Sequence, residues 1–144
     1  MPYRIQIDER FTFSKSRCFN IAEIKKRKFL DIPQKQGIYV LHNSSHASFW
    51  KNQHNIFYIG AANREKLRTR IRKHVKRLGG ITPDNKKLYE IGKSNQFDLS
   101  SFFVSYFAFE SEAPDYYPFL FEGYLINKYL EKFGVLPEAN TGRR

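Results

Sequence analysis

The sequence predicts one mixed α/β or α+β domain, in which helices flank a small and largely antiparallel β-sheet. Short runs rich in β-branched and aromatic residues alternate with longer segments of helical periodicity, the pattern expected when helices cover a sheet. Two of the short runs are separated only by a polar, turn-rich segment, which indicates a hairpin. The chain has 144 residues, 41% hydrophobic and 17% aromatic, enough for a single packed domain over residues 1–144.

The N-terminal part of the chain is expected to form a strand and then a helix. Residues 3–7 alternate apolar and polar side chains, as a half-buried strand does. Asn20 and Glu23 have the spacing of a capping pair, so a helix is predicted from there to about Phe29. Pro33 is expected to stop it.

The hairpin and the helix after it follow from local patterns. Residues 37–41 (GIYVL) and 55–60 (NIFYIG) are predicted to be its two strands. Asn63 can cap a helix that runs to Leu78 and is ended by the glycine pair at 79–80. The apolar stripe of this helix is Leu67, Ile71, Val75 and Leu78.

The last third of the chain predicts a strand and a long helix. Residues 81–96 are expected to be a loop or a short helix, and residues 99–109 a strand. A helix is predicted from about Pro118, ended by Gly134 and followed by an extended tail over 137–144. Its apolar stripe is expected to include Phe119, Ile126, Tyr129, Leu130 and Phe133.

The formal charge of +11 is the unusual feature of the composition. Such an excess favours an acidic partner, with nucleic acid ahead of an anionic membrane. Residues 64–77 hold eight Lys or Arg and a single acid, Glu65, whereas a face that serves only solubility usually mixes signs. We therefore expect this stretch to follow a phosphate backbone, through Arg64, Lys66, Arg68, Arg72, Lys73, Lys76 and Arg77.

Several classes of protein are excluded or disfavoured. Cys18 is the one cysteine, so neither an internal disulfide nor an all-cysteine zinc site can form. No apolar stretch approaches the ~20 residues that a membrane span requires, and the first residues lack the apolar core of a signal peptide. We expect a cytoplasmic protein with no membrane partner.

Polar residues of unusual placement recur in order along the chain. The tripeptides GIY and YIG each lie on a predicted strand, and an arginine and a histidine follow one helical turn apart, on one face. A glutamate and an asparagine come near the end. They are Gly37–Tyr39, Tyr58–Gly60, Arg70, His74, Glu122 and Asn140.

Together these features resemble the GIY-YIG nuclease superfamily. The resemblance covers residues 36–141 as a catalytic core, with residues 1–35 as an N-terminal extension. It implies the GIY-YIG fold and a metal-dependent endonuclease that hydrolyses phosphodiester bonds of double-stranded or branched DNA by a single-metal mechanism. Cleavage of both strands would favour a homodimer, and recruitment by a larger partner is the other expectation.

The resemblance assigns a role to each matched residue. Glu122 would hold one divalent cation, Mg²⁺ (or Mn²⁺), which takes few protein carboxylates and completes its shell with water and phosphate. Arg70 would neutralise the non-bridging oxygens of the phosphate, a task that suits a guanidinium. Either Tyr39 or Tyr58 would orient or deprotonate the attacking water, with Tyr39 favoured. Two further residues are implied to assist: His74 as a relay or phosphate contact, and Asn140 as the residue that orients Glu122 or a tyrosine.

Two departures from the family pattern leave alternatives open. Many members have a lysine directly after YIG, where this chain has Ala61. A DNA-binding module that keeps the fold with weak or lost cleavage is therefore the second reading. The hairpin loop is also long, and its aromatic and basic residues are candidate DNA contacts. The spacing of its histidines is only a weak indication of a zinc site. These residues are His42, His46, Trp50, Lys51 and His54.

Overall fold

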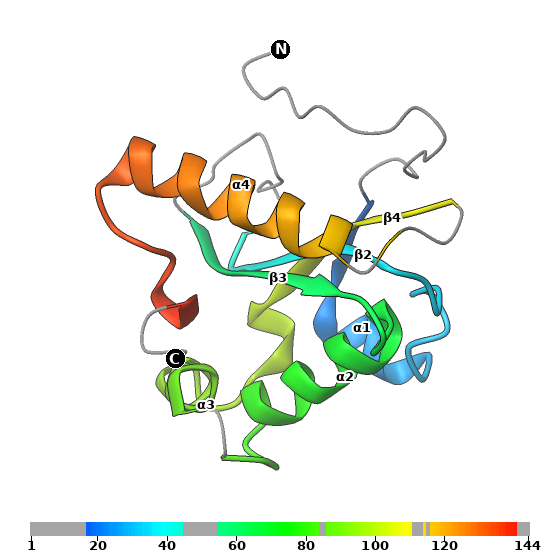
Figure 1. Cartoon of the computed structure of the whole chain (residues 1–144). Helices are drawn as coiled ribbons and strands as arrows, with labels where there is room; N and C mark the ends of the chain where they lie inside the picture. The colour runs from blue at the N-terminus through cyan, green and yellow to red at the C-terminus, as the bar shows by residue number, and fades with distance from the viewer. Residues whose placement is uncertain (1–16, 45–54, 84–85, 111–113, 115, 141–144) are drawn as a thin grey trace.

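A computed structural model gives the fold, shown in Figure 1. It describes residues 17–44, 55–83, 86–110, 114 and 116–140. The predicted strand at 3–7 and most of the hairpin loop therefore lie outside the described residues. The architecture is the expected one: a small antiparallel sheet flanked by helices. Among the described helices, none is long and apolar enough to cross a membrane.

The sheet has four strands in the order β1-β4-β2-β3, and every neighbouring pair is antiparallel. The predicted hairpin is confirmed, since Tyr39 of β2 lies opposite Gly60 of β3. The first strand of the sheet was not predicted. The four strands are β1 (Arg17–Asn20), β2 (Gly37–His42), β3 (Ile56–Ala62) and β4 (Phe103–Ala108).

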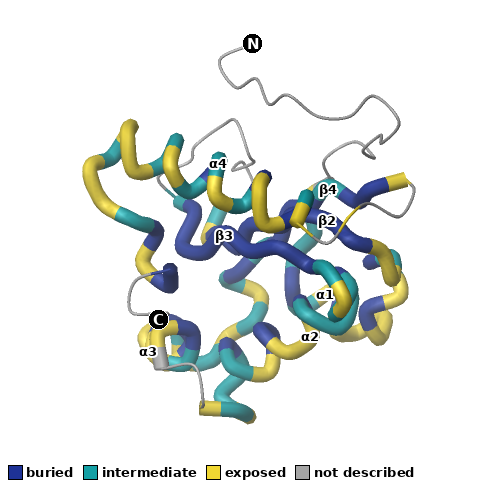
Figure 2. The backbone as a smooth tube through the Cα atoms, viewed as in Figure 1, coloured by how far each residue is buried: buried dark blue, intermediate teal, exposed yellow. Residues whose placement is uncertain are grey.

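The helices cover both faces of the sheet (Figures 1 and 2). One core unites α1, α2 and α3 with one face, and a second core packs α4 against the other. All of β2 and β3 is buried, as strands covered on both sides are. The four helices are α1 (Ile21–Lys26), α2 (Leu67–Leu78), α3 (Lys86–Ser94) and α4 (Tyr116–Phe133).

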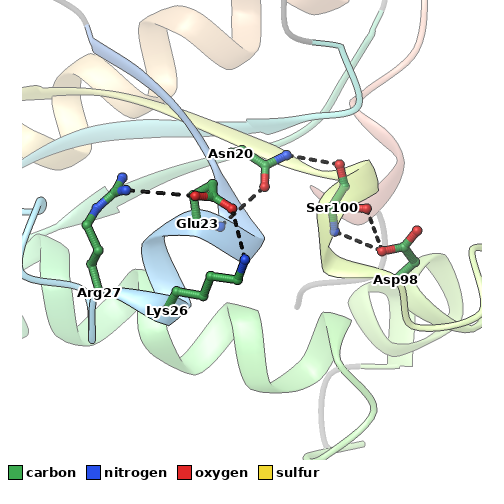
Figure 3. Close-up of polar contacts among 6 residues, drawn as sticks. All are labelled: Asn20, Glu23, Lys26, Arg27, Asp98 and Ser100. Atoms are coloured by element: carbon green, nitrogen blue, oxygen red, sulfur yellow. Dashed lines mark hydrogen bonds and ion pairs between the residues drawn. The ribbon is translucent and has the colours of Figure 1, made fainter.

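The predicted cap of α1 is present, but the helix ends earlier than expected. Asn20 accepts a hydrogen bond from the backbone N–H of Glu23 at 3.3 Å and donates to the Ser100 carbonyl at 2.9 Å (Figure 3). The helix stops at Lys26 because Lys28 and Phe29 have positive φ angles of 56° and 63°, outside the helical region.

Two other element starts were predicted too early. Helix α2 begins at Leu67, with Lys66 as its N-cap, because the Asn63 side chain accepts a hydrogen bond from Gln36 instead. The expected strand at 99–109 is shortened, since a 3₁₀ turn over Leu99–Ser101, capped by the Asp98 side chain, precedes β4. In both places a side-chain hydrogen bond accompanies the later start: a long-range one between Gln36 and Asn63, and a local one between Asp98 and Ser100.

The predicted stripe of α4 is only partly correct: Ile126 and Tyr129 pack against the second core, but other members do not. Phe119 and Leu130 are 55% and 40% exposed, whereas Pro118, Phe121 and Leu125 are buried against the sheet. Apolar residues surround most of this helix, so periodicity alone does not select the buried face.

The bounds of α4 and of the segment after it also differ from the expectation. The helix begins at Tyr116, earlier than expected. Beyond it, a 3₁₀ turn over Glu138–Asn140 replaces the first part of the predicted extended tail.

The N-terminal segment is part of the core. Ile21, Ile24 and Ile32 are fully buried and share a cluster with Tyr39 of β2. The described part of the predicted extension, from residue 17, therefore packs with the domain.

Candidate active site

The glycine of each tripeptide stands where no side chain fits. A Cβ on Gly37 would lie 2.1 Å from the Phe107 carbonyl oxygen, and a Cβ on Gly60 would lie 2.5 Å from Cζ and 2.6 Å from Oη of Tyr39. Real Cβ atoms do not approach other atoms so closely, because such contacts are strongly repulsive. Both glycines thus let neighbouring groups pack directly on the hairpin backbone.

A buried polar cluster lies on the α2 side of the sheet; we call it the tyrosine–histidine cluster. It consists of Tyr39, Tyr58 and His74, which are all at most 2% exposed. The Tyr39 hydroxyl lies 2.7 Å from His74 Nε2. The ring centroids are 6.0 Å apart for the two tyrosines and 4.9 Å apart for Tyr58 and His74. Three of the residues singled out in the sequence therefore meet.

Arg77 fixes the direction of hydrogen bonding in this cluster. Its Nη1 atom lies 3.2 Å from His74 Nδ1. A guanidinium can only donate, so Nδ1 must accept and the ring proton must be on Nε2. Nε2–H then donates to the Tyr39 oxygen, which leaves the phenol's own proton free to point elsewhere.

Asn140 holds the backbone of the YIG segment. Its Oδ1 accepts from the N–H of Ile59 and its Nδ2 donates to the carbonyl of Ile59, both at 2.9 Å. These are the bonds that a neighbouring strand would supply, and β3 is the last strand in the order of the described sheet. Asn140 contacts the residue between Tyr58 and Gly60, and the side-chain hydrogen bonds described for it go to that backbone.

A pocket of about 530 Å³ lies beside this cluster; we call it the Arg70–Glu122 pocket. Arg70 comes from the first half of α2 and Glu122 from the first half of α4. The two helices lie on opposite faces of the sheet, and the two residues line one pocket with Ala61 of β3, the last strand in the order of the described sheet. Among the described residues, the lining of the pocket is Ala61, Asn63, Arg64, Glu65, Arg70, Phe119 and Glu122. Neither tyrosine lines it.

Arg70 connects the pocket to the buried cluster. Its guanidinium contacts Glu65 at 3.4 Å. Burial disfavours its charge, but nearby Tyr39 and Tyr58 outweigh this and raise the pKa of Arg70, so it remains a cation. Its Nε is a buried donor for which the described residues supply no hydrogen-bond partner. The guanidinium thus retains hydrogen-bonding capacity.

The pKa of Tyr39 is raised well above its usual value. Burial is the main cause, and interaction with Tyr58 adds to it. The charge of Arg70 and a hydrogen bond from it act in the opposite direction, while the carboxylate of Glu122 raises the pKa further. Tyr39 therefore keeps its proton at neutral pH.

Glu65 belongs to the pocket but was not predicted as a site residue. It is ion-paired with Lys73 as well as Arg70. The hydrogen bond from Lys73, together with the charge of Arg70, lowers the pKa of Glu65. The run of basic residues hid this single acid, and its spacing of five and eight residues from Arg70 and Lys73 does not match a helical charge pair.

The basic residues of 64–77 divide into two groups. Arg72 and Lys76 are exposed on α2, and Arg64 is exposed at the pocket. Others have internal partners: Arg68 donates to the Ile32 carbonyl at 2.7 Å, Lys73 pairs with Glu65, and Arg77 contacts His74. Lys66 is the N-cap residue of α2.

Of the five predicted DNA contacts in the hairpin segment, the structure describes only His42. His42 is buried on β2, where Nε2 lies 2.8 Å from Ser105 Oγ and Nδ1 lies 2.8 Å from the Ser44 carbonyl. Burial lowers the pKa of His42. The other candidates of the hairpin loop, at positions 46–54, are outside the described residues.

A divalent cation would find a limited set of ligands here. Within the described ranges, no group of three or more His, Cys, Asp or Glu side chains could together hold a metal ion. Glu122 and Glu65 both line the pocket, and Glu65 is already paired with cations. The donor set thus fits a hard ion held by the single carboxylate of Glu122 and otherwise by water and phosphate.

Comparisons of the chain with protein-family models, with curated proteins and with solved structures give no match.

Proposed function

We propose that this protein is a metal-dependent endonuclease that hydrolyses DNA phosphodiester bonds. The observation that carries the proposal is the pocket in which Arg70 and Glu122 meet, directly beside the buried Tyr39–His74 pair. The sequence resemblance to GIY-YIG nucleases names the same four residues. Their convergence from three separate elements of the fold supports a shared role.

Arg70 would bind the scissile phosphate. It is a cation that lines the pocket, and within the described part of the chain its Nε donor has no hydrogen-bond partner. A guanidinium offers parallel N–H groups that match two phosphate oxygens. It would neutralise charge that builds on the phosphoryl group as the bond breaks. Arg64, which also lines the pocket, would guide the adjacent backbone.

Tyr39 would orient the attacking water, and it would receive that water's proton only as the phenolate, after its own proton has passed to solvent. His74 Nε2–H and Arg70 both donate to the phenolic oxygen, an arrangement that favours the ionised phenol. Burial and the Glu122 carboxylate oppose ionisation. Mg²⁺ or Mn²⁺, when held by Glu122, would supply charge neutralisation at the phosphoryl and leaving oxygens and offset the effect of the carboxylate on Tyr39.

A second candidate function is DNA binding without efficient cleavage. Two observations favour it: Ala61 occupies the pocket wall where a lysine follows YIG in many GIY-YIG nucleases, and neither tyrosine reaches the pocket surface. A protein of this kind would bind DNA through the exposed cations of α2 and hold the tyrosine–histidine cluster as a packed interior.

Nicking of supercoiled plasmid in Mg²⁺ or Mn²⁺ separates the two candidates. We expect cleavage by the wild-type chain, and a loss of at least about 100-fold in Glu122→Ala and in Arg70→Ala, because each removes a group that stabilises transition-state charge. Matched controls are Glu131→Ala, an exposed carboxylate on the same helix, and Lys25→Ala, an exposed lysine on α1 that has no part in the proposed DNA contact.

The outcomes are distinct. Nicking that survives both pocket substitutions rules out the assignment of Glu122 and Arg70. DNA binding by the wild type without nicking in either metal supports the second candidate. Loss of nicking in all four variants alike indicates a general loss of charge or folding and removes support for a specific site.

A further inference from the structure

The first turn of α4 presents apolar side chains to solvent. Tyr116, Phe119 and Leu120 are 61%, 55% and 54% exposed. They are spaced i, i+3 and i+4 and so share one face of the helix. Exposed large apolar groups that gather in one place commonly mark a contact surface, whereas single ones do not.

Phe119 joins this face to the Arg70–Glu122 pocket, since it lines the pocket together with Arg70 and Arg64. On the same helix, Tyr116 packs edge-on against Tyr117 with ring centroids 5.0 Å apart. An exposed aromatic ring, that of Phe119, thus lines the same pocket as two cations. Two carboxylates also line the pocket, and Glu65 is compensated by Arg70 and Lys73. With Glu122 occupied by the proposed cation, the pocket can accept an anion and, beside it, a flat apolar group.

The pocket arginines and the exposed Phe119 ring together suit one class of ligand. A nucleotide carries both an anionic phosphate and a flat ring system that can stack on an aromatic side chain. Inside a perfect duplex both faces of a base are covered by its neighbours, so away from the ends an aromatic side chain can reach a base face only where a nucleotide has left the stack.

We propose that Phe119 is a stacking platform for an unstacked base, adjacent to the phosphate bound at Arg70. This inference rests on the proposed function and narrows its substrate. The preferred DNA contains a bulged, mismatched or branched nucleotide, and a fully paired duplex binds more weakly.

Fluorescence anisotropy tests the inference with the full chain in EDTA, where no metal-dependent cleavage occurs. The probes are a DNA duplex with one unpaired 2-aminopurine and the fully paired duplex of the same sequence. We expect about tenfold tighter binding of the bulged probe, with quenching of the 2-aminopurine by stacking. Phe119→Ala should abolish the preference and change affinity for the paired duplex less than about twofold.

Two further variants make the result specific. Phe119→Trp should keep the preference, because it retains an aromatic face. Leu130→Ala, which truncates another exposed apolar residue of the same helix, should also keep it. Equal binding of the two probes by the wild type overturns the inference. So does a Phe119→Leu variant that matches the wild type, since leucine cannot stack.

Failure of the inference differs from failure of the proposed function. Glu122-dependent nicking in Mg²⁺ without a preference for the bulged probe overturns the inference alone. A Phe119-dependent preference without any nicking overturns the nuclease proposal alone. If Phe119→Ala converts a dimer to a monomer and leaves the preference intact, the occupant of this face is a second copy of the chain, and the inference is wrong.

Discussion

The two halves of the candidate site are built by opposite means. The tyrosine–histidine cluster is buried, hydrogen-bonded and packed against Gly60. The Arg70–Glu122 pocket is lined by partly exposed charged side chains. Buried groups are fixed by close packing, and a change there disturbs the interior. Exposed groups have few packing partners, so a change there alters chemistry with little effect on folding. We therefore expect substitutions in the tyrosine–histidine cluster to lower stability, and substitutions in the Arg70–Glu122 pocket to lower activity with little loss of stability.

Gly60→Ala should have the largest effect on stability. The new methyl group would lie 2.5–2.7 Å from atoms of both tyrosines, and relieving that overlap should cost about 3 kcal/mol. Urea denaturation measures the loss. Gly123→Ala is the matched control, because a Cβ there meets nothing within 4 Å, and on a helix it should add about 0.5–1 kcal/mol. Equal stability of the two variants would contradict the close packing of the cluster.

Asn140→Ala should come next, with a loss of about 2 kcal/mol. The substitution leaves the N–H and the carbonyl of Ile59 without their side-chain partner in a buried strand. Hydrogen exchange of the Ile59 amide should accelerate with it. Asn95→Ala removes a single partly buried hydrogen bond to Ile91 and should cost less. A stable Asn140→Ala variant with slow exchange at Ile59 would show that these bonds are dispensable.

Tyr39→Phe should cost about 1 kcal/mol at neutral pH, because His74 loses the acceptor for its Nε2–H. Tyr106→Phe, which removes a hydroxyl bonded to the Asp31 carbonyl, is the control. The ¹⁵N shifts of the His74 ring should report a proton on Nε2 in the wild type. A proton on Nδ1 would contradict the role assigned to Arg77.

The same phenol makes stability depend on alkaline pH. The folded pKa of Tyr39 is raised by burial, so its contribution is fully present below the unfolded pKa of about 10. It declines as pH rises above that value, by up to about 1.4 kcal/mol per pH unit. Urea denaturation from pH 8 to 11 should show the wild type losing its advantage over Tyr39→Phe. A pH-independent difference would mean that Tyr39 ionises equally in both states.

Glu122→Gln should have the smallest effect on stability and a large one on function. The side chain is partly exposed and keeps its shape, so the free energy of unfolding should change by less than about 0.5 kcal/mol. Nicking in Mg²⁺ should nevertheless fall by at least about 100-fold, as the cation ligand is lost. A destabilisation as large as that of Asn140→Ala would place Glu122 with the packed half of the site.

The sequence by itself determined the fold class, the β2–β3 hairpin and the buried stripe of α2, because these follow from local periodicity and turn residues. Only the tertiary structure decided the buried face of α4, the pairing of β1 with β4, the start of α2 and the separation of the two halves of the site. The sequence indicated that Tyr39, Arg70, His74 and Glu122 belong together. It did not indicate that Arg77 orients His74 or that Glu65 shares the pocket. Such contacts arise when distant segments pack, and a one-dimensional pattern carries no distance between them.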